Sequence, residues 1–150
     1  MKQGPERELV ARYLDRAVLS GKPLGLTGFA VTELTESRAS SGPSRKSEEA
    51  RIIREHLPEA GIFVALDEHG KTQGSEDFAQ RLARWRDDGK QAVTFLIGGA
   101  DGIEPDLVKT ADVTLSFSPL TWPHQLVRIM LAEQLYRATT ILSGHPYHRE

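Results

Sequence analysis

The sequence contains no cysteine, which excludes a disulfide framework and a thiolate metal site. It also lacks an apolar run long enough to span a bilayer, and its polar N-terminus lacks the apolar stretch of a signal peptide. Charge of neither sign is in large excess: the formal net charge is −2, so the chain has no general attraction to a polyanion. The cytoplasm is therefore the expected location, and any contact with nucleic acid must come from a local patch, since the charge alone does not suggest one.

What is present is an ordinary globular composition, with 39% hydrophobic and 27% charged residues. A chain of 150 residues is long enough to bury a core and too short for two ordinary domains. We therefore interpret residues 1–150 as a single domain.

Helical and strand-like segments alternate along the chain. Apolar residues at helical spacing predict helices over 6–20, 47–57, 75–86, 105–110 and 123–143. Compact apolar runs predict strands over 31–36, 62–66, 92–97 and 113–117. Ser37 to Ser47 is expected to be a mobile basic loop, and Asp67 to Gly70 a turn. This alternation predicts an α/β fold with a mostly parallel sheet that is covered on both faces.

Three loops follow the carboxyl ends of expected strands, where parallel sheets bind their ligands. They are Leu66 to Gly70, Gly98 to Gly102 and Ser118 to Trp122. The glycine loop matches neither the dinucleotide fingerprint nor a phosphate loop, which disfavours an ordinary NAD or ATP enzyme. Taken alone, its glycines are better explained by a strand-to-helix turn that needs positive φ.

The chain ends in a polar tail, residues 145–150, after a helix that can close the fold. No core requires titratable groups there, so the tail is a candidate functional segment. Tyr147 offers an aromatic ring with a hydroxyl, and Arg149 offers a cation. His145 or His148 is suited to accept a proton. The alternative is a frayed terminus. No carboxylate or thiolate at ligand spacing supports metal binding by the histidines, so no metal site is expected.

The long helix expected from Pro123 to about Ser143 is apolar on more than one face. Its apolar residues are Leu126, Val127, Ile129, Met130, Leu131, Leu135, Ile141 and Leu142. So much apolar surface must be buried on more than one side. We favour a two-fold homodimer over a central helix in a monomer core.

Four segments together resemble the ribosomal RNA large-subunit methyltransferase H (RlmH) family of the SPOUT class. They are IGGADG at 97–102, LSFSPLTWPH at 115–124, LAEQLYRA at 131–138 and HPYH at 145–148. Their order and spacing fit from about Gly4 to the end. The resemblance implies a SPOUT-type α/β fold whose C-terminal segment, about residues 92–150, threads a loop to form a trefoil knot. Knots are rare, and periodicity gives no sign of one.

The resemblance further implies a homodimer that uses S-adenosyl-L-methionine to methylate N3 of a pseudouridine in helix 69 of 23S rRNA, on the assembled 70S ribosome. By position, the cofactor contacts fall on the three strand-end loops: Leu66, Gly98, Phe117, Ser118, Pro119, Leu120, Thr121 and Trp122. The catalytic candidates are Tyr147, His148 and Arg149, with His145 as a further candidate. No metal is required, because the sulfonium charge already activates the methyl donor.

The chain departs from the family pattern at its start. Family members usually begin with a strand before the first helix, whereas this sequence starts almost at that helix, so the expected N-terminal strand is absent. Such a loss leaves a sheet edge unpaired or rearranges the N-terminal half. A non-catalytic ribosome- or RNA-binding module, or a truncated inactive form, is therefore the alternative. An unrelated α/β hydrolase is disfavoured because no Gly-x-Ser-x-Gly elbow is present.

Overall fold

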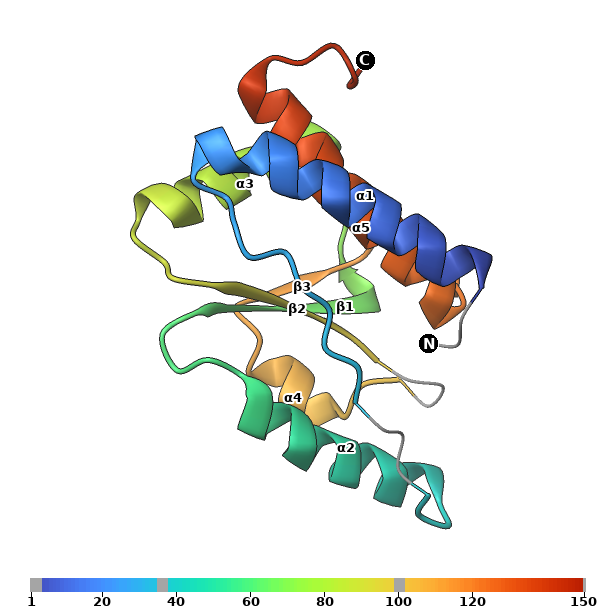
Figure 1. Cartoon of the computed structure of the whole chain (residues 1–150). Helices are drawn as coiled ribbons and strands as arrows, with labels where there is room; N and C mark the ends of the chain where they lie inside the picture. The colour runs from blue at the N-terminus through green and yellow to red at the C-terminus, as the bar shows by residue number, and fades with distance from the viewer. Residues whose placement is uncertain (1–3, 35–37, 99–101, 150) are drawn as a thin grey trace. The chain divides into compact units, whose positions relative to one another are not determined.

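The computed structural model describes residues 4–34, 38–98 and 102–149. They form two compact units, each assembled from separate stretches of the chain (Figure 1). The first unit takes its residues from Met1–Thr32, Gln73–Gly89 and Gln125–Glu150, and the second from Glu33–Thr72 and Lys90–His124.

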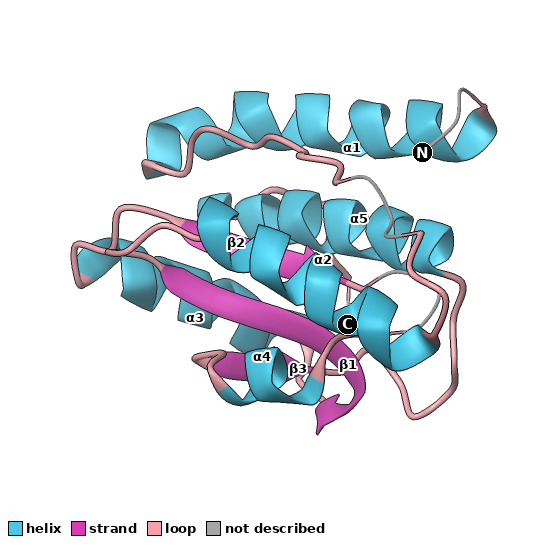
Figure 2. Ribbon diagram, turned by 90° about the horizontal axis from the view of Figure 1, so that it is seen from below, coloured by secondary structure: helices cyan, strands magenta, loops and turns pink. Residues whose placement is uncertain are grey.

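The second unit contains a parallel sheet. In the described part of the chain it has three strands, β1 (Ile62–Lys71), β2 (Val93–Ile97) and β3 (Val113–Leu115), in the order β2-β1-β3 (Figure 2). Both strand pairings are parallel, which confirms the predicted sheet type. β2 lies at one end of this order and is half-buried throughout.

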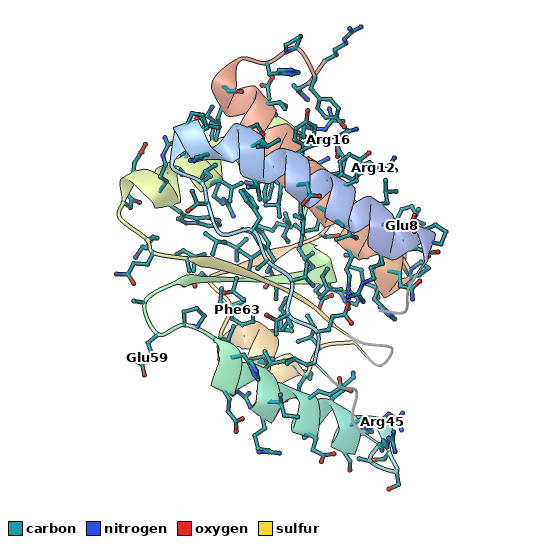
Figure 3. All side chains as sticks on the ribbon, in the orientation of Figure 1. Glu8, Arg12, Arg16, Arg45, Glu59 and Phe63 are labelled. Carbon is teal, nitrogen blue, oxygen red and sulfur yellow. The ribbon has the colours of Figure 1, made fainter. Side chains whose placement is uncertain are left out.

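One face of the sheet is covered by α2 (Gly42–His56) and α4 (Pro105–Lys109), as Figure 1 shows. Side chains of a strand alternate between faces, so Phe63 and Ala65 share the helix-covered face (Figure 3). They pack with Ala50 of α2 and Leu107 of α4 in a buried core cluster. Helices laid on a sheet are how α/β folds bury the apolar face of the sheet.

α2 begins earlier than the sequence predicted, so the expected loop at 37–47 is wrong from Gly42 onward. The Ser41 side chain accepts a hydrogen bond from the Ser44 N–H at 3.1 Å and caps the helix. Pro43 lies in the first turn, where a missing N–H is no loss. The serine, glycine and proline that suggested a loop are therefore the start signals of a helix.

β1 continues through Lys71, so the expected separate turn at 67–70 is also wrong. Its pairing with β3 shifts register between Leu66 and Lys71. A Cβ at Gly70 would lie 2.6 Å from the Thr114 carbonyl oxygen, so glycine permits this close approach. β3 ends at Leu115, two residues before the expected end.

The strand expected at 31–36 is not formed over residues 31–34, and residues 35–36 lie outside the described ones. Val31 is 52% exposed there. A β-branched composition indicates a surface that suits a strand, but it does not supply a pairing neighbour. Residues 4–34 as described contain helix and coil without a strand.

The first unit is helical and contains α1 (Pro5–Gly21), the 3₁₀ turn η1 (Lys22–Leu24), α3 (Ser75–Asp87) and α5 (His124–Ser143). The helices predicted over 6–20, 75–86 and 123–143 are confirmed. α1 contacts α5 through the rings of Tyr13 and Tyr136, whose centroids are 6.4 Å apart. The Ser75 hydroxyl of α3 donates to Gln134 of α5 at 2.9 Å. Among the described residues, no helix is long and apolar enough to cross a membrane.

Candidate functional site

The three strand ends predicted to bind a ligand meet at one edge of the sheet in the second unit. Leu66 pairs with Ile97 on one side and with Leu115 on the other. Gly98 directly follows Ile97, and the turn that carries Phe117 to Trp122 begins just after Leu115. The structure therefore brings together the cofactor-binding candidates; residues 99–101 of the glycine loop lie outside the described residues.

Gly98 is needed because of space, not because of its φ angle. A Cβ at this position would lie 2.7 Å from Cγ1 of Ile103 and 2.9 Å from the carbonyl carbon of Gly102. Of the two described glycines in this loop, Gly102 is the one with positive φ, at 83°. The turn explanation thus fits Gly102, whereas Gly98 allows two stretches of backbone to approach closely.

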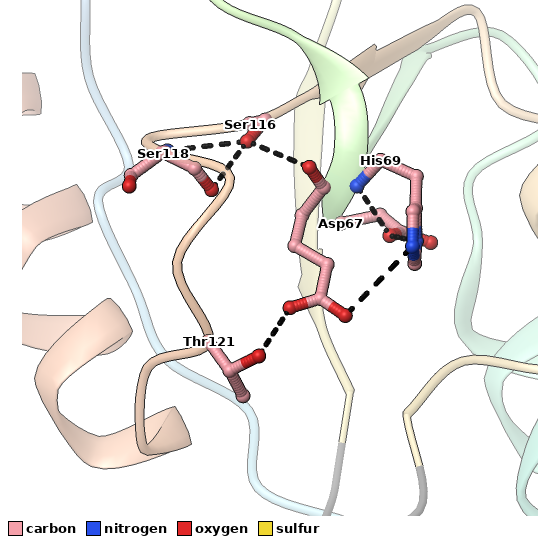
Figure 4. A network of polar contacts seen from close by, with 6 residues as sticks. Asp67, His69, Ser116, Ser118 and Thr121 are labelled. Carbon is pink, nitrogen blue, oxygen red and sulfur yellow. Dashed lines mark hydrogen bonds and ion pairs between the residues drawn. The ribbon is translucent and has the colours of Figure 1, made fainter.

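The turn after β3 is shaped by its own serines (Figure 4). Ser116 is 3% exposed, and its hydroxyl accepts from the Ser118 N–H at 3.1 Å. The Ser118 hydroxyl in turn accepts from the Leu120 N–H at 3.0 Å. Each bond joins a side chain to the backbone two residues on, which is the local geometry of a serine turn. The backbone from 116 to 120 is therefore held in a defined shape.

A second set of contacts joins this turn to the end of β1. The Thr121 hydroxyl donates to Oε2 of Glu68 at 2.6 Å. Oε1 of Glu68 lies 3.9 Å from Nε2 of His69, whose ring is 84% exposed. Asp67 accepts from the His69 N–H at 2.9 Å (Figure 4). Sequence reasoning missed Glu68, because its partner lies 53 residues away.

Apolar side chains surround this polar edge. Leu120 is 65% exposed and Trp122 is 39% exposed, while Leu66, midway along β1, is half-buried. Exposed apolar groups beside backbone polar groups are typical of sites for small ligands with ring faces.

In the first unit, the polar tail follows the end of α5 at Gly144, which has a φ of 76°. The His145 N–H donates to the Thr140 carbonyl at 2.9 Å, and the Gly144 N–H donates to the Ile141 carbonyl at 3.3 Å. This pair of bonds is a Schellman cap, the usual ending of a helix at glycine. The tail therefore leaves α5 in a fixed direction.

Tyr147 anchors the tail to α5. Its hydroxyl donates to Oε1 of Glu133 at 3.2 Å, and its ring lies 4.7 Å from that of Tyr136. The Arg137 guanidinium lies 4.9 Å from the centroid of the Tyr147 ring, within cation–π range. Nε of Arg137 also donates to Oε1 of Glu133 at 2.8 Å. A frayed terminus does not describe this segment.

His148 is held by the same arginine. Its Nδ1 lies 3.1 Å from Nη1 of Arg137, and its Nε2 lies 3.8 Å from Oε1 of Glu76. Because arginine can only donate, Nδ1 of His148 must be the acceptor, which assigns the proton of the neutral ring to Nε2. Nδ1 of His145 likewise accepts, from the Tyr147 N–H at 3.1 Å. Arg149 is exposed.

Burial and the charge of Glu133 raise the pKa of Tyr147 to about 12, and the charge of Arg137 opposes this only in part. The hydroxyl therefore stays protonated at neutral pH and acts as a hydrogen-bond donor, not as a base. The hydrogen bond to Glu133 raises the pKa of Arg137, which remains a cation.

Comparison with known proteins adds to this geometry. A family profile described as "Predicted SPOUT methyltransferase" matches residues 1–148. The ribosomal RNA large subunit methyltransferase H proteins of Rhizobium rhizogenes and Brucella anthropi are each 55% identical over 149 residues, and that of Bradyrhizobium diazoefficiens is 51% identical. Each alignment covers 99% of this chain and 93% of the relative. The chain belongs to the RlmH family of SPOUT methyltransferases.

Family membership confirms the resemblance seen in the sequence, and the parallel sheet with flanking helices agrees with the SPOUT fold class. The knot expected over about residues 92–150 stays a prediction, since part of the loop concerned lies outside the described residues. The structure places the cofactor-binding candidates in the second unit and the catalytic candidates Tyr147, His148, Arg149 and His145 in the first.

Sequence reasoning also missed Ser116, Glu133 and Glu76. The spacing of Glu133 and Arg137 was a usable signal, since residues four apart on a helix are neighbours.

Proposed function

We propose that this RlmH-family protein methylates N3 of a pseudouridine in helix 69 of 23S rRNA on the assembled 70S ribosome, with S-adenosyl-L-methionine as the methyl donor. Support comes from family membership over nearly the whole chain and from relatives named as ribosomal RNA methyltransferases. The observation that carries the proposal is the convergence of Leu66, Gly98 and the turn from Phe117 to Trp122 at one sheet edge.

In this proposal, the polar and apolar groups of the donor meet groups of matching kind at this edge. The backbone beside Gly98 and the turn from Ser118 offers hydrogen-bonding groups for the polar edges of the adenosine. Leu66, Leu120 and Trp122 offer apolar contacts for its ring faces. S-adenosyl-L-methionine supplies a methyl group that its sulfonium charge already activates. The protein therefore contributes mainly position, by holding donor and acceptor in line.

The tail acts on the acceptor base in this proposal. N3 must lose a proton, and a nearby positive charge favours the anion that forms. Arg149 is an exposed cation suited to that role, and the protonated Tyr147 is suited to contact the base. In both histidines Nδ1 already accepts a hydrogen bond. Either Nδ1 can take a proton from the base only after that hydrogen bond has broken. We therefore favour Arg149 for charge stabilisation and assign His145 and His148 to orienting the tail.

The assembly we propose is a cytoplasmic homodimer. Residues 1–150 are its single SPOUT domain, with a trefoil knot over about residues 92–150. Leu126 of α5 is 42% exposed, and a second copy packed on this helix would cover it. Light scattering at micromolar concentration should give the dimer mass; a monomer would contradict this part of the proposal.

The decisive experiment is transfer of labelled methyl from S-adenosyl-L-methionine to 70S ribosomes that lack the modification, beside free large subunits and naked 23S rRNA. We expect label only in intact ribosomes, at pseudouridine N3. Donor binding without transfer would instead support the alternative of a non-catalytic ribosome-binding module or an inactive form, which the absence of a strand within residues 4–34 brings into consideration.

A further inference from the structure

We propose that Glu68 is a positioning residue that presets the turn from Ser118 to Trp122 for the methyl donor. The inference rests on the proposed function, because it concerns the same site. Its basis is the contact between the end of β1 and the tip of the turn, where the Thr121 hydroxyl donates to Glu68 at 2.6 Å (Figure 4).

Glu68 contacts the turn at two points. Its backbone carbonyl lies 3.2 Å from the buried hydroxyl of Ser116, at the base of the turn, although the nearer acceptor of that hydroxyl is the Ser118 carbonyl at 2.8 Å. Its carboxylate accepts from Thr121, near the tip. The Ser116 N–H also donates to the carbonyl of Lys71 at 2.9 Å. The donor-binding candidates between the two points are therefore held against β1 from both ends.

The neighbouring acidic and imidazole groups do not share this role. Asp67 is engaged by the N–H and, at 3.1 Å, by the ring nitrogen Nδ1 of His69. The His69 ring lies 3.9 Å from Glu68, too far for a hydrogen bond. The short contact of the Glu68 carboxylate is thus the one to Thr121. Hydrogen bonds to an ionised acceptor are stronger than neutral ones.

The contact also limits what Thr121 does. The Thr121 hydroxyl has one hydrogen, which it donates to Glu68. In a hydrogen bond with the bound methyl donor, this hydroxyl can therefore act only as an acceptor. Thr121 therefore serves binding mainly by being held in place. If the Glu68–Thr121 hydrogen bond, which we call the clamp, is removed, the turn samples other conformations. The apparent affinity for the methyl donor then falls in proportion to the fraction of molecules whose turn has the binding conformation.

Calorimetric titration with S-adenosyl-L-methionine tests this clamp. We expect Glu68→Ala and Thr121→Val each to weaken donor binding by about tenfold, the loss that corresponds to one charge-assisted hydrogen bond. The double variant should also lose about tenfold, because the two groups act through one contact. Glu68→Gln keeps an acceptor oxygen and should lose only about threefold.

The matched control is Glu59→Ala, which removes an exposed glutamate from the loop before β1 (Figure 3). It should bind the donor as the wild type does. In methyl transfer, Glu68→Ala should raise KM for the donor by about tenfold and leave kcat at saturating donor unchanged, a split that general loss of folding would not produce.

Three outcomes contradict different claims. Affinity of Glu68→Ala within about twofold of the wild type, or losses that multiply to about a hundredfold in the double variant, would overturn the positioning role alone. Donor binding that depends on Glu68, in a protein that transfers no methyl to ribosomes, would contradict the proposed function alone. No donor binding by the wild type would overturn both.

Discussion

The strand-end turn of the second unit and the tail of the first unit are held by different kinds of contact. Serine hydroxyls and backbone groups shape the turn, together with the Glu68 carboxylate, and apolar Leu120 and Trp122 are left exposed. Charged groups and rings hold the tail, around Glu133 and Arg137. The first arrangement is suited to present a fixed shape to a ligand, and the second to present charge and protons. We infer that donor binding and acceptor activation are divided between them.

Each region also contains a glycine, and the two glycines have different roles. At Gly98 a side chain has no room, since a Cβ would meet Ile103 and Gly102. At Gly144 the space around a Cβ is open, and the positive φ that ends α5 is what glycine supplies. One glycine lets backbone approach backbone, whereas the other sets the direction of the tail.

The largest effect is expected from Gly98→Ala. The added methyl group forces the backbone of 98 and 102 apart at the proposed donor site, and overpacking of this kind costs about 1–3 kcal/mol. Donor affinity measured by calorimetry should fall by about ten- to a hundredfold. Gly74→Ala is the control, because nothing lies within 4 Å of a Cβ there. Equal affinity in both variants would contradict the close-approach argument.

The next largest effect is expected from Glu133→Ala, which alters the tail and should slow methyl transfer. It removes the acceptor shared by Arg137 and Tyr147, and hydrogen bonds to charged groups contribute about 1.5–3 kcal/mol. Single-turnover methyl transfer should slow by about tenfold or more, while donor affinity stays unchanged. Glu133→Gln, which keeps one acceptor oxygen, should lie between this variant and the wild type. A loss of donor affinity would break the proposed division.

Tyr147→Phe tests the electrostatics of the tail. The pKa of Tyr147 in the folded protein, about 12, lies above the ordinary value of about 10 for an unfolded chain. The folded state therefore holds this proton more tightly, so the stabilisation is complete below about pH 10 and is lost as pH rises toward 12. Absorbance titration should reveal a tyrosine that ionises near pH 12 in the wild type and is missing in the variant. Ionisation of that tyrosine at an ordinary pH would contradict the contact with Glu133.

The smallest functional effect is expected outside both regions. Ser41→Ala removes the cap of α2 and should lower the free energy of unfolding by about 1 kcal/mol, which denaturant titration can measure. Donor affinity and methyl transfer should be unchanged at a temperature where the variant is folded. A change in donor affinity or in methyl transfer would mean that a loss of stability alone alters these two measurements. The larger effects expected for the other variants would then have to be corrected for their loss of stability.

Local patterns predicted much of the framework and little of the contacts that fix the site. The apolar runs at 62–66 and 92–97 correctly indicated adjacent parallel strands, and their ends correctly indicated where the candidate residues gather. The serine-rich stretch before Ala50 misled, because loop composition and helix start signals use the same residues. The end of β1 misled in the same way, since Asp67 and Gly70 suit a turn but here lie in a strand with shifted register.

The contacts of the site depend on the folded chain. Glu68 meets Thr121 across 53 residues, and no periodicity in the sequence encodes such a pair. Tyr147 meets Glu133 across 14 residues, because the Schellman cap at Gly144 turns the tail toward α5. Sequence alone suggested that the tail residues are functional. The roles of their nitrogen and oxygen atoms follow only from the partners that the fold supplies.

The most direct test of the proposed division measures donor affinity and single-turnover methyl transfer for Glu68→Ala and Glu133→Ala on the same 70S ribosomes. We predict opposite patterns: Glu68→Ala weakens donor binding by about tenfold and transfers at the wild-type rate when the donor is saturating, whereas Glu133→Ala binds the donor normally and transfers about tenfold more slowly. If both variants change both quantities to the same extent, the turn and the tail do not divide the work, and the account is contradicted.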